Sequence, residues 1–322
     1  MPRFARSQVI LAKIETVYGT DPVPTGAANA LLVSNMSVVP LQANNVDRAL
    51  LRPYFGASEQ LVGTRTVQLS FDVELVGSGT AGTAPAWAPL IRACGFAETT
   101  NVAWVSYLPV TTVQDSLTLY LNDSGVQHVL LGARGTVVFK LNAGENPVMS
   151  FTFTGLYGAV TAAALPTPVY TAFRTPQIPN DAQTLDLVLG GTLSVAAAPT
   201  ITGGTSLPSL GLEVDVGNSV PFTPLIGGES VDITDRSVSG SLRLDQTAAQ
   251  EVTRMAAVLA ATLSSVGLSH GTTTGDKVLL WMPTAQFIEP TKEELNSRRL
   301  QGYKLRGVPV SGNDELRILT SF

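Results

Sequence analysis

Two stretches of alternating polar and apolar residues constrain this chain more than any other feature. The first, residues 65–75, reads RTVQLSFDVEL, with polar side chains at the even positions and apolar ones at the odd positions from Val67. The second, residues 236–244, reads RSVSGSLRL and alternates in the same way. Period-two alternation places the two sets of side chains on opposite faces of a strand. Each stretch therefore predicts a β-strand with one wet face and one packed face.

These two strands belong to a pattern that occurs twice in the same order. Arg65 and Phe71 match Arg236 and Leu242 at an offset of 171 residues. A strand over 33–41 matches 214–222 at an offset of 181, and 148–154 matches 300–306 at an offset of 152. The order predicts one module used twice, over residues 31–160 and 208–322. An N-terminal arm, residues 1–30, precedes them, and a linker rich in Pro, Gly and Thr, residues 161–207, joins them.

Each module carries one helix signal after its alternating strand. In the first module, four residues spaced as one stripe of a helix end at a possible capping glycine, Gly95: Trp87, Leu90, Ile91 and Cys94. In the second, Thr247 and Gln250 form a capping-box pattern. We expect its buried stripe to be Val252, Met255, Ala256, Leu259 and Leu263. The predicted fold is mainly β (α+β), with two tandem β-sandwich or barrel modules, each with one flanking helix.

The composition indicates a protein that buries much of its surface in an assembly. Hydrophobic residues make up 44% of the 322 residues and charged residues only 14%, so a large core is combined with a charge-poor surface. The net charge of −5 argues against a nucleic-acid-binding patch of clustered Lys and Arg. No apolar run approaches the roughly 20 residues of a membrane-spanning helix, so we expect no membrane partner. The single cysteine, Cys94, excludes an intrachain disulfide and fits a small buried hydrophobe.

The residues that could carry chemistry favour structural roles. His128 and His270 lie in different modules, without Cys or carboxylate at metal-ligand spacing. The glycine-rich stretch 77–82 lacks the Lys-Ser/Thr pair of a phosphate-binding loop. Two carboxylate pairs, Asp232 with Asp235 and Glu293 with Glu294, have no apolar surroundings that would separate their pKa values. We therefore predict no catalytic residue, no metal site and no cofactor, and hence no enzyme.

The long connection between the first two strands, residues 42–59, predicts contact with a partner. A connection of this length in a compact domain is usually functional or disordered. It carries residue types that are enriched at protein interfaces, namely Arg48, Arg52, Tyr54 and Phe55.

Three runs of residues resemble the tail tube (major tail) proteins of long, non-contractile-tailed bacteriophages. They are AKIETVYGTDP over 12–22, FDVEL followed by GTAGTAPAW over 71–87, and LIRACGF over 90–96. The resemblance covers most of residues 9–100, whereas the second module matches in element order. It implies a virion structural protein that polymerises as stacked rings, each closing a β-barrel channel for genomic DNA. Related rings contain six one-module or three two-module subunits, and the duplication favours the trimer.

The resemblance also assigns expected roles to residues and partners. A DNA channel should have a polar, non-basic wall, because cationic side chains would hold phosphates. The polar faces of the two alternating strands fit that wall: Gln68, Ser70, Asp72, Glu74, Ser237, Ser239, Ser241 and Arg243. We expect Arg243 to pair with Asp72 or Glu74 of an adjacent module, and the arm and Arg48, Arg52, Tyr54 and Phe55 to make contacts between rings. Expected partners are the chain itself, tape-measure and tail-end proteins, and viral DNA in transit without specific binding, with assembly in the host cytoplasm.

The sequence leaves two other classes of function open. A baseplate or decoration subunit of the virion would share the β-rich, charge-poor composition. A carbohydrate-binding protein or an enzyme would need a concave site with convergent polar groups, for which the sequence offers no candidate.

Overall fold

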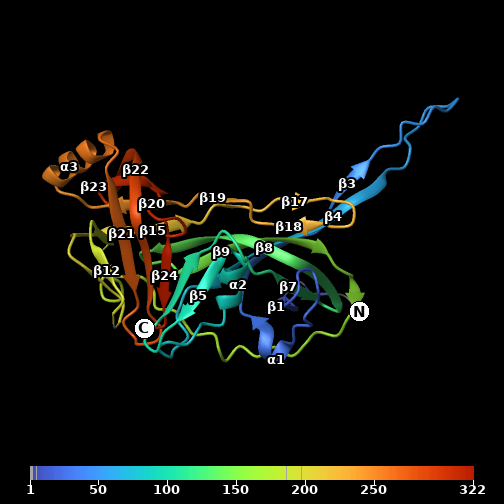
Figure 1. The fold of residues 1–322 in the computed structure, drawn as a ribbon, viewed down its shortest axis with the longest axis horizontal. Helices are drawn as coiled ribbons and strands as arrows, with labels where there is room; N and C mark the ends of the chain where they lie inside the picture. The colour runs from blue at the N-terminus through green and yellow to red at the C-terminus, as the bar shows by residue number, and fades with distance from the viewer. Residues whose placement is uncertain (1–2, 5, 186, 197) are drawn as a thin grey trace.

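A computed structural model describes residues 3–4, 6–185, 187–196 and 198–322 (Figure 1). Residues 1, 2 and 5 of the predicted arm, and residues 186 and 197 of the predicted linker, lie outside the described residues. The chain is mainly β, as predicted, and most of its strands join one antiparallel sheet that extends through both halves of the chain. Within the described residues, the sheet of a single subunit does not close into a barrel.

The first half of the chain contains the alternating strand 65–75 as part of β4. In order, its elements are β1 (Gln8–Ile14), α1 (Gly26–Asn29), β2 (Ala30–Leu31), β3 (Ser34–Val46), β4 (Leu61–Glu74), α2 (Ala88–Ala93), β5 (Phe96–Thr100), β6 (Val105–Pro109), β7 (Leu117–Asp123), β8 (Val126–Asn142) and β9 (Val148–Tyr157). The odd positions of β4 from Val67 to Val73 are buried, and its even positions from Gln68 to Glu74 are half-buried. The alternation therefore predicted both faces of β4 correctly from Val67 to Glu74, whereas Thr66, predicted on the wet face, is buried.

The second half of the chain contains the second alternating strand as β20. Its elements are β15 (Ser209–Asp215), β16 (Asn218–Ser219), β17 (Phe222–Thr223), β18 (Ser230–Val231), β19 (Asp235–Arg236), β20 (Ser239–Leu244), α3 (Ala248–Leu259), β21 (Leu263–His270), β22 (Val278–Leu295), β23 (Arg298–Gly307) and β24 (Arg317–Thr320). Val238, Leu242 and Leu244 are buried, whereas Ser239 and Arg243 are exposed. The two-faced pattern predicted for this strand is confirmed, but the strand begins at Ser239 and not at Arg236, which belongs to β19.

Eight strands follow one another across the main sheet in the order β3, β4, β9, β8, β15, β20, β23, β22. The two halves meet where β8 pairs with β15, from Val138 opposite Asp215 to Asn142 opposite Gly211. The apolar faces of both halves contribute to one hydrophobic core. At its centre, Phe71 lies 5.9 Å from both Phe151 and Phe153, measured between ring centroids.

Two long strands connect this main sheet to the layer beneath it. β8 pairs with β7 before a bulge near Leu131 and with β15 after it, and β7 leads on to β1 and β2. β22 similarly pairs with β21 and β24, and β24 leads to β6 and β5. Figure 1 shows β1, β7 and α2 below β8 and β9. The apolar face of the sheet is thus covered, and its polar face is left outward.

The stretch 161–207 crosses from the first half to the second and contributes strands of its own. These are β10 (Thr161–Ala162), β11 (Leu187–Leu189), β12 (Thr192–Ser194), β13 (Thr200–Thr202) and β14 (Thr205–Leu207). β11 pairs with β21 and with β14, so part of this stretch belongs to the main hydrogen-bonded sheet.

Two segments that we expect to contact partners lie very differently on the molecule. Strand β1 of the N-terminal segment pairs with β7 over seven residue pairs, and its residues from Val9 to Ala12 are buried. The β3–β4 hairpin instead extends away from the body, with residues 47–60 at its end (Figure 1). We call the exposed outer part of this hairpin, residues 42–65, the projecting hairpin and residues 47–60 its tip.

The burial predicted from the sequence is confirmed for α2 and wrong for α3. Around α2, Trp87, Leu90, Ile91 and Cys94 are buried, and Gly95 ends the helix with φ +79°, as predicted. The buried stripe predicted for α3 was wrong, because Val252 is 71% and Leu259 85% exposed, and Leu263 and Ala256 are exposed as well. Instead, α3 packs through Glu251, Arg254 and Val258: Glu251 pairs with Lys292, and Arg254 lies over the ring of Phe287.

The strand predicted over 214–222 was also placed incorrectly. β15 begins at Ser209 and ends at Asp215. Gly217 follows with φ +62°, a left-handed conformation that interrupts a strand and that glycine adopts without strain. The chain then continues as a long hairpin, residues 216–238, which includes β16 to β19.

Candidate functional site

The candidate functional site is the outward polar face of the main sheet, to which β4 contributes four side chains. Ser70 and Thr152 of β9 are 3.1 Å apart between their hydroxyl oxygens. Asp72 Oδ2 accepts a hydrogen bond of 2.8 Å from Asn35, and Glu74 Oε1 accepts one of 3.0 Å from Asn146. Gln68 lies opposite Thr154. The four predicted side chains of the first half therefore lie together on one half-exposed surface.

The predicted residues of the second half lie on and beside β20. Ser239, Ser241 and Arg243 alternate with its buried positions, and Ser237 is exposed just before the strand. The Nε atom of Arg243 lies 3.5 Å from a carboxylate oxygen of Glu293 on β22. Within the subunit, the partner of Arg243 is thus Glu293, and not the expected Asp72 or Glu74.

Strand register places the two sets on the same side of one continuous sheet. Side chains of directly opposite residues project to the same face. From β4, Ser70 lies opposite Thr152, which lies opposite Thr136 of β8. On the same face of β8, Lys140 lies opposite Glu213 of β15. Glu213 lies opposite Ser241 of β20, which in turn lies opposite Lys304 of β23. We call this surface, from Gln68–Glu74 on β4 to Arg243 and Lys304 in the second half, the polar face.

The charges of the polar face are mixed, with a carboxylate excess. Seven carboxylates lie on it or pair with its cationic side chains, of which there are five: Asp72, Glu74, Glu213, Asp215, Asp232, Glu289 and Glu293, with Arg134, Lys140, Arg243, Lys304 and Arg306. Lys304 pairs with Glu289 at 2.5 Å. Arg134 pairs with Asp232 and Arg243 with Glu293, so three of the five cations are paired locally, which reduces their availability to an external anion.

The alternating strands indicated only part of this face. The contribution of β9 was visible in the sequence, because Ser150, Thr152 and Thr154 alternate with Phe151 and Phe153. The contribution of β15 was not, because β15 is short and its pairing with β8 joins residues about 70 positions apart. Lys140 and Glu213 meet only through that pairing.

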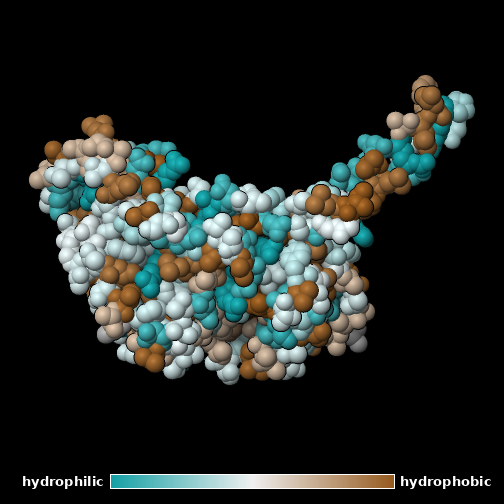
Figure 2. All heavy atoms as spheres, viewed as in Figure 1, coloured by the Kyte–Doolittle hydropathy of each residue, from teal (hydrophilic) through white to brown (hydrophobic). Residues whose placement is uncertain are grey.

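The predicted contact residues of the long connection lie at the tip of the projecting hairpin. Leu51 and Phe55 are fully exposed, and Tyr54 is exposed as well. Arg48 and Arg52 both pair with Glu59 across the tip, so these cations hold the two strands of the tip together. Figure 2 shows apolar surface along this hairpin and a second apolar area at α3. Exposed apolar groups of this size favour contact with another protein.

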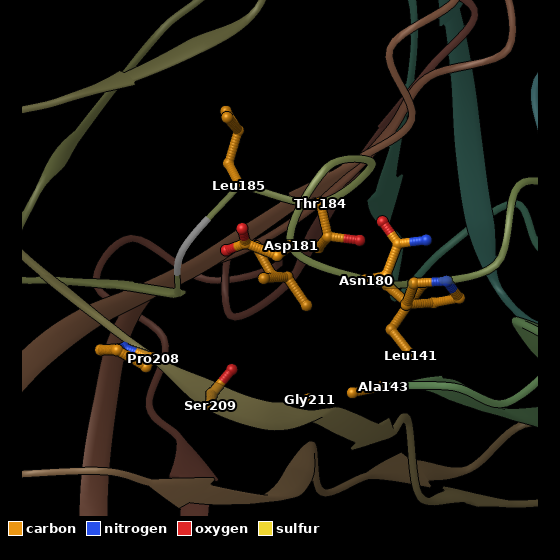
Figure 3. Close-up of a pocket in the computed structure, with 11 residues that line it drawn as sticks. Leu141, Ala143, Asn180, Asp181, Thr184, Leu185, Pro208, Ser209 and Gly211 are labelled. Carbon is orange, nitrogen blue, oxygen red and sulfur yellow. The ribbon is translucent and has the colours of Figure 1, made fainter.

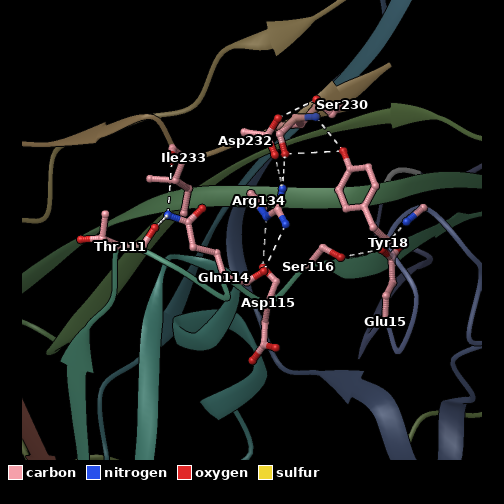
Figure 4. A network of polar contacts seen from close by, with 12 residues as sticks. Glu15, Tyr18, Thr111, Gln114, Asp115, Ser116, Arg134, Ser230, Asp232 and Ile233 are labelled. Atoms are coloured by element: carbon pink, nitrogen blue, oxygen red, sulfur yellow. Dashed lines mark hydrogen bonds and ion pairs between the residues drawn. The ribbon is translucent and has the colours of Figure 1, made fainter. Parts of the chain in front are cut away.

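A second hairpin, residues 216–238, lies against the first half of the same chain, and we call it the docked hairpin. Arg134 of β8 holds it through hydrogen bonds to the carbonyl of Val231 (2.7 Å) and to Asp232 (2.6 Å) (Figure 4). The Tyr18 hydroxyl accepts a hydrogen bond of 2.6 Å from the Val231 amide, and the Arg134 guanidinium lies 4.9 Å from the Tyr18 ring. Gln114 donates to the carbonyl of Ile233.

The base of the docked hairpin also contacts the end of α2. The Asn218 side-chain amide donates to the carbonyl of Cys94, at 2.7 Å, and to that of Gly135, at 2.9 Å. The backbone amide of Asn218 donates to the Thr136 hydroxyl at 3.2 Å. These contacts attach the docked hairpin to α2 and β8 together.

Beneath this surface, Glu15 is a buried carboxylate with four donors. The Ser116 hydroxyl and the Gly19 amide donate to Oε2, and the Thr118 hydroxyl and the Gly132 amide donate to Oε1, all at 2.7–2.8 Å. A buried carboxylate that is fully hydrogen-bonded is stable without an ion-pair partner. Glu15 therefore fixes the N-terminal segment to β7 and to the β8 bulge, next to the docked hairpin.

A small cavity of about 160 Å³ lies between the turn after β8 and the linker (Figure 3). Among its described lining residues, Asp181 is the one ionisable side chain, and it has no base beside it for acid–base chemistry. In the described part of the chain, no group of three or more His, Cys, Asp or Glu side chains could hold a metal ion. No helix in the described ranges is long and apolar enough to span a membrane.

Four titratable residues that the sequence offers as candidates for chemistry are buried or held in hydrogen bonds and ion pairs. His270 is buried, with Nδ1 2.8 Å from the Thr184 hydroxyl and Nε2 2.8 Å from the Gln177 carbonyl. Burial raises the pKa of the Cys94 thiol well above its ordinary value, as expected for a packed side chain. Asp232 pairs with Arg134, and Glu293 pairs with Arg243.

Comparison with known proteins identifies the family. A search of curated proteins found no match. A family model described as phage tail tube protein matches residues 5–313, which is nearly the whole chain and includes both halves of the polar face. Membership implies a structural component of the virion tail that self-assembles. The chain belongs to the phage tail tube protein family.

Proposed function

We propose that three copies of this chain form a ring, that rings stack into the tail tube, and that the polar face lines the bore through which DNA passes. The observation that carries the proposal is the continuity of the polar face across both halves. A bore wall needs one water-compatible surface per subunit with an apolar surface behind it. The main sheet has both, because its apolar side forms the core.

The repeated strand order supports two ring modules per subunit. The first half has β3, β4, β9 and β8 side by side, and the second has β15, β20, β23 and β22 in the same relative order. Phe71 lies opposite Phe151, and Leu242 lies opposite Tyr303. These are the positions that the sequence offsets of 171 and 152 relate to each other. Three subunits would then give a ring of six modules with pseudo-sixfold symmetry.

Pairing between the halves suggests how the ring closes. Inside the subunit, β15 of the second half pairs with β8 of the first. At the borders of the polar face, β3 pairs with β4, and the 291–295 part of β22 pairs with β23. Neither has another partner strand among the described residues. In the ring, β3 of one subunit would pair with the 291–295 edge of β22 in the next subunit, as β15 pairs with β8 inside the subunit. Three such junctions would close the channel.

The charge of the polar face suits DNA that moves past without binding. Its excess of carboxylates opposes phosphate binding, and two of its cations are paired with Glu289 and Glu293. We further propose that Arg48, Arg52, Tyr54 and Phe55 at the hairpin tip make contacts between rings. Tape-measure and tail-end proteins would meet the completed tube inside the bore and at its ends.

Native mass spectrometry combined with negative-stain electron microscopy of the purified, concentrated chain tests this function. We expect trimers or multiples of three in the mass spectra, and rings or tubes in the images. Monomers without rings or tubes would contradict the proposal and favour another virion role. Six subunits arranged as two stacked rings of three agree with the proposal, whereas a single ring of six subunits in the images would contradict the two-module assignment and would indicate that one half of each chain lines the bore.

A further inference from the structure

We propose that a pocket around Arg254 binds one carboxylate group, supplied by an aspartate or glutamate side chain of a partner chain. The pocket has a volume of about 280 Å³ and lies between α3 and β14. We call it the Arg254 pocket, and its polar lining side chains are Thr205, Gln246, Gln250, Thr253 and Arg254. The proposal goes beyond the proposed function, because neither the polar face nor the projecting hairpin contributes to this pocket.

Arg254 carries a half-buried positive charge without a partner in the described part of the chain. Three other half-buried arginines pair with carboxylates of their own chain, namely Arg92, Arg134 and Arg236. A fourth, Arg317, donates to the Ser106 hydroxyl. Among the described residues, Arg254 has neither an ion pair nor a hydrogen-bond acceptor, and its Nε atom is buried without one. Buried charges are ordinarily paired, so the surroundings of Arg254 are incomplete in the isolated subunit.

Packing against β22 holds the Arg254 side chain in place. Its guanidinium carbon lies 4.8 Å from the centroid of the Phe287 ring, and Phe287 is buried. The face of an aromatic ring attracts a cation, but it leaves the hydrogen-bond donors at the edge of the guanidinium without acceptors. Burial lowers the pKa of Arg254 below its ordinary value, because desolvation disfavours the charged form. A carboxylate in the pocket would offset this cost and would accept parallel hydrogen bonds from the guanidinium.

Two glutamine side chains add hydrogen-bond donors to the Arg254 pocket. Gln250 Oε1 accepts a hydrogen bond of 2.9 Å from the backbone amide of Thr247, as part of the capping box of α3. Gln246 Oε1 accepts one of 3.0 Å from the Tyr303 hydroxyl. Both amide oxygens are thus engaged, and each side chain keeps an NH2 group that only donates. Neither NH2 group has an acceptor among the described residues, so the pocket presents one cation and two amide donors, the complement of an oxyanion.

The charge of the Arg254 pocket favours a carboxylate over a phosphate. Arg254 is the one charged side chain among the described lining residues. Lys292, which lies beside α3, is paired with Glu251 at 3.0 Å, so this pair adds no net charge. A single positive charge matches a singly charged carboxylate, whereas a phosphate group carries about −1.5 to −2 at pH 7.

The position of the pocket indicates a protein as the source of the carboxylate. Phe287 lies opposite Leu305, and both are buried, so the Arg254 pocket is on the side of the sheet away from the polar face. On the same helix, Val252 and Leu259 are exposed, and Figure 2 shows the apolar area that they belong to. Exposed apolar side chains next to an unpaired cation fit an acidic residue with apolar neighbours on another chain.

Chemical footprinting with phenylglyoxal, which modifies arginine side chains, tests the chemistry of the pocket. The probe is propionate, a mimic of the glutamate side chain, and mass spectrometry identifies each modified arginine. At a propionate concentration of twice its dissociation constant, the modification rate of Arg254 should fall about threefold by mass action, relative to sodium chloride at equal ionic strength. Arg317 is the internal control, because it is also half-buried and has no carboxylate partner among the described residues. Its rate should not change.

Three results of the footprint would overturn the proposal: an unchanged rate for Arg254, an equal decrease for Arg317, or stronger protection of Arg254 by inorganic phosphate than by propionate.

Melting temperatures give a second measurement of the same binding. Propionate should raise the melting temperature of the native chain and of the matched control Arg317→Gln, because a ligand that binds the folded state stabilises it. It should not raise that of Arg254→Gln, which keeps a side chain of similar polarity without the charge. An equal rise in Arg254→Gln would contradict the proposal.

The same footprint on assembled tails, in a buffer without carboxylates, tests the source of the carboxylate. Arg254 should react more slowly in tails than in the free subunit, whereas Arg317 again serves as the reference. Slow reaction in tubes of the chain alone would place the acidic residue on another copy, and slow reaction only in complete tails would place it on a different tail protein. An Arg254 that reacts in tails as fast as in the free subunit would overturn the assignment to a partner chain.

Discussion

At the scale of single residues, His270 connects the linker to the second half of the sheet. It is the last residue of β21, and its two ring nitrogens meet the Thr184 hydroxyl and the Gln177 carbonyl. A neutral imidazole satisfies both partners, with one nitrogen accepting from Thr184 and the other donating to Gln177. Burial lowers the pKa of His270 below its ordinary value, and the hydrogen bond to Gln177 opposes this effect.

This pKa shift predicts a pH dependence of stability. An unfolded histidine has a pKa of about 6.5. Because the folded pKa is lower, the unfolded chain binds more protons as the pH falls below about 6.5, and the free energy of unfolding decreases there. We expect the melting temperature of the chain to fall more between pH 7.5 and pH 5.5 than that of a His270→Gln variant. Parallel pH profiles for the two proteins would contradict this assignment.

At the scale of elements, the tip of the projecting hairpin can be removed without disturbing the core. Leu51, Tyr54 and Phe55 are exposed, and the ion pairs of Arg48 and Arg52 with Glu59 stay within the tip. Replacing residues 50–57 by a short Gly-Ser turn should leave circular dichroism and melting temperature nearly unchanged. We expect electron microscopy to show no tubes, because the contacts between rings are lost. Tubes of normal length would contradict the role of the tip.

The sequence predicts the elements well where a signal is local. The alternation of β4 and β20 is local, because burial of one face is all that it requires. The stripe around α2 is confirmed for the same reason, since Leu90 and Ile91 are buried by their own chain. The stripe of α3 has equally good spacing, yet Leu259 is exposed in the subunit. The spacing of apolar residues shows that one face of a helix is apolar, but it does not show what covers that face.

Other features depend on contacts that the sequence pattern does not contain. Pro221 suggests a match with Pro40 at an offset of 181, but Gly217 follows the end of the strand, and the register relates Asp215 to Val39 at an offset of 176. The strand pairing between β8 and β15 likewise has no sequence signature. The polar faces of β4 and β20 could therefore be predicted from the sequence as two separate surfaces. Their connection through β8 and β15 into one continuous polar face could not.

At the scale of the whole molecule, the charge of the polar face can be tested by its effect on DNA transit. Asp72 and Glu74 are half-buried and hydrogen-bonded to one asparagine each, so replacing both with lysine should cost about 1–2 kcal/mol of folding stability. In assembled particles, Asp72→Lys with Glu74→Lys would make each ring a collar that binds phosphate. We expect slower DNA ejection at low salt and partial recovery at high salt, because the Debye length falls from roughly 8 Å at 0.15 M to 3 Å at 1 M.

The matched control replaces the same residues with Asn and Gln, which removes the charge and keeps the size. These neutral variants should eject DNA at a rate close to that of the native chain. Unimpaired ejection at low salt by the lysine variant, from particles with normal tails, would show that Asp72 and Glu74 do not face the DNA path.

The most direct test of the whole account is a cryo-electron microscopy reconstruction of tubes assembled from the native chain. We expect three subunits in each ring, with Gln68, Ser70, Asp72 and Glu74 of one half and Ser237, Ser239, Ser241 and Arg243 of the other on the inner wall. Strand β3 of each subunit should lie beside β22 of its neighbour. A reconstruction with the polar face on the outer surface of the tube, or with only one half of each chain along the bore, would contradict the account.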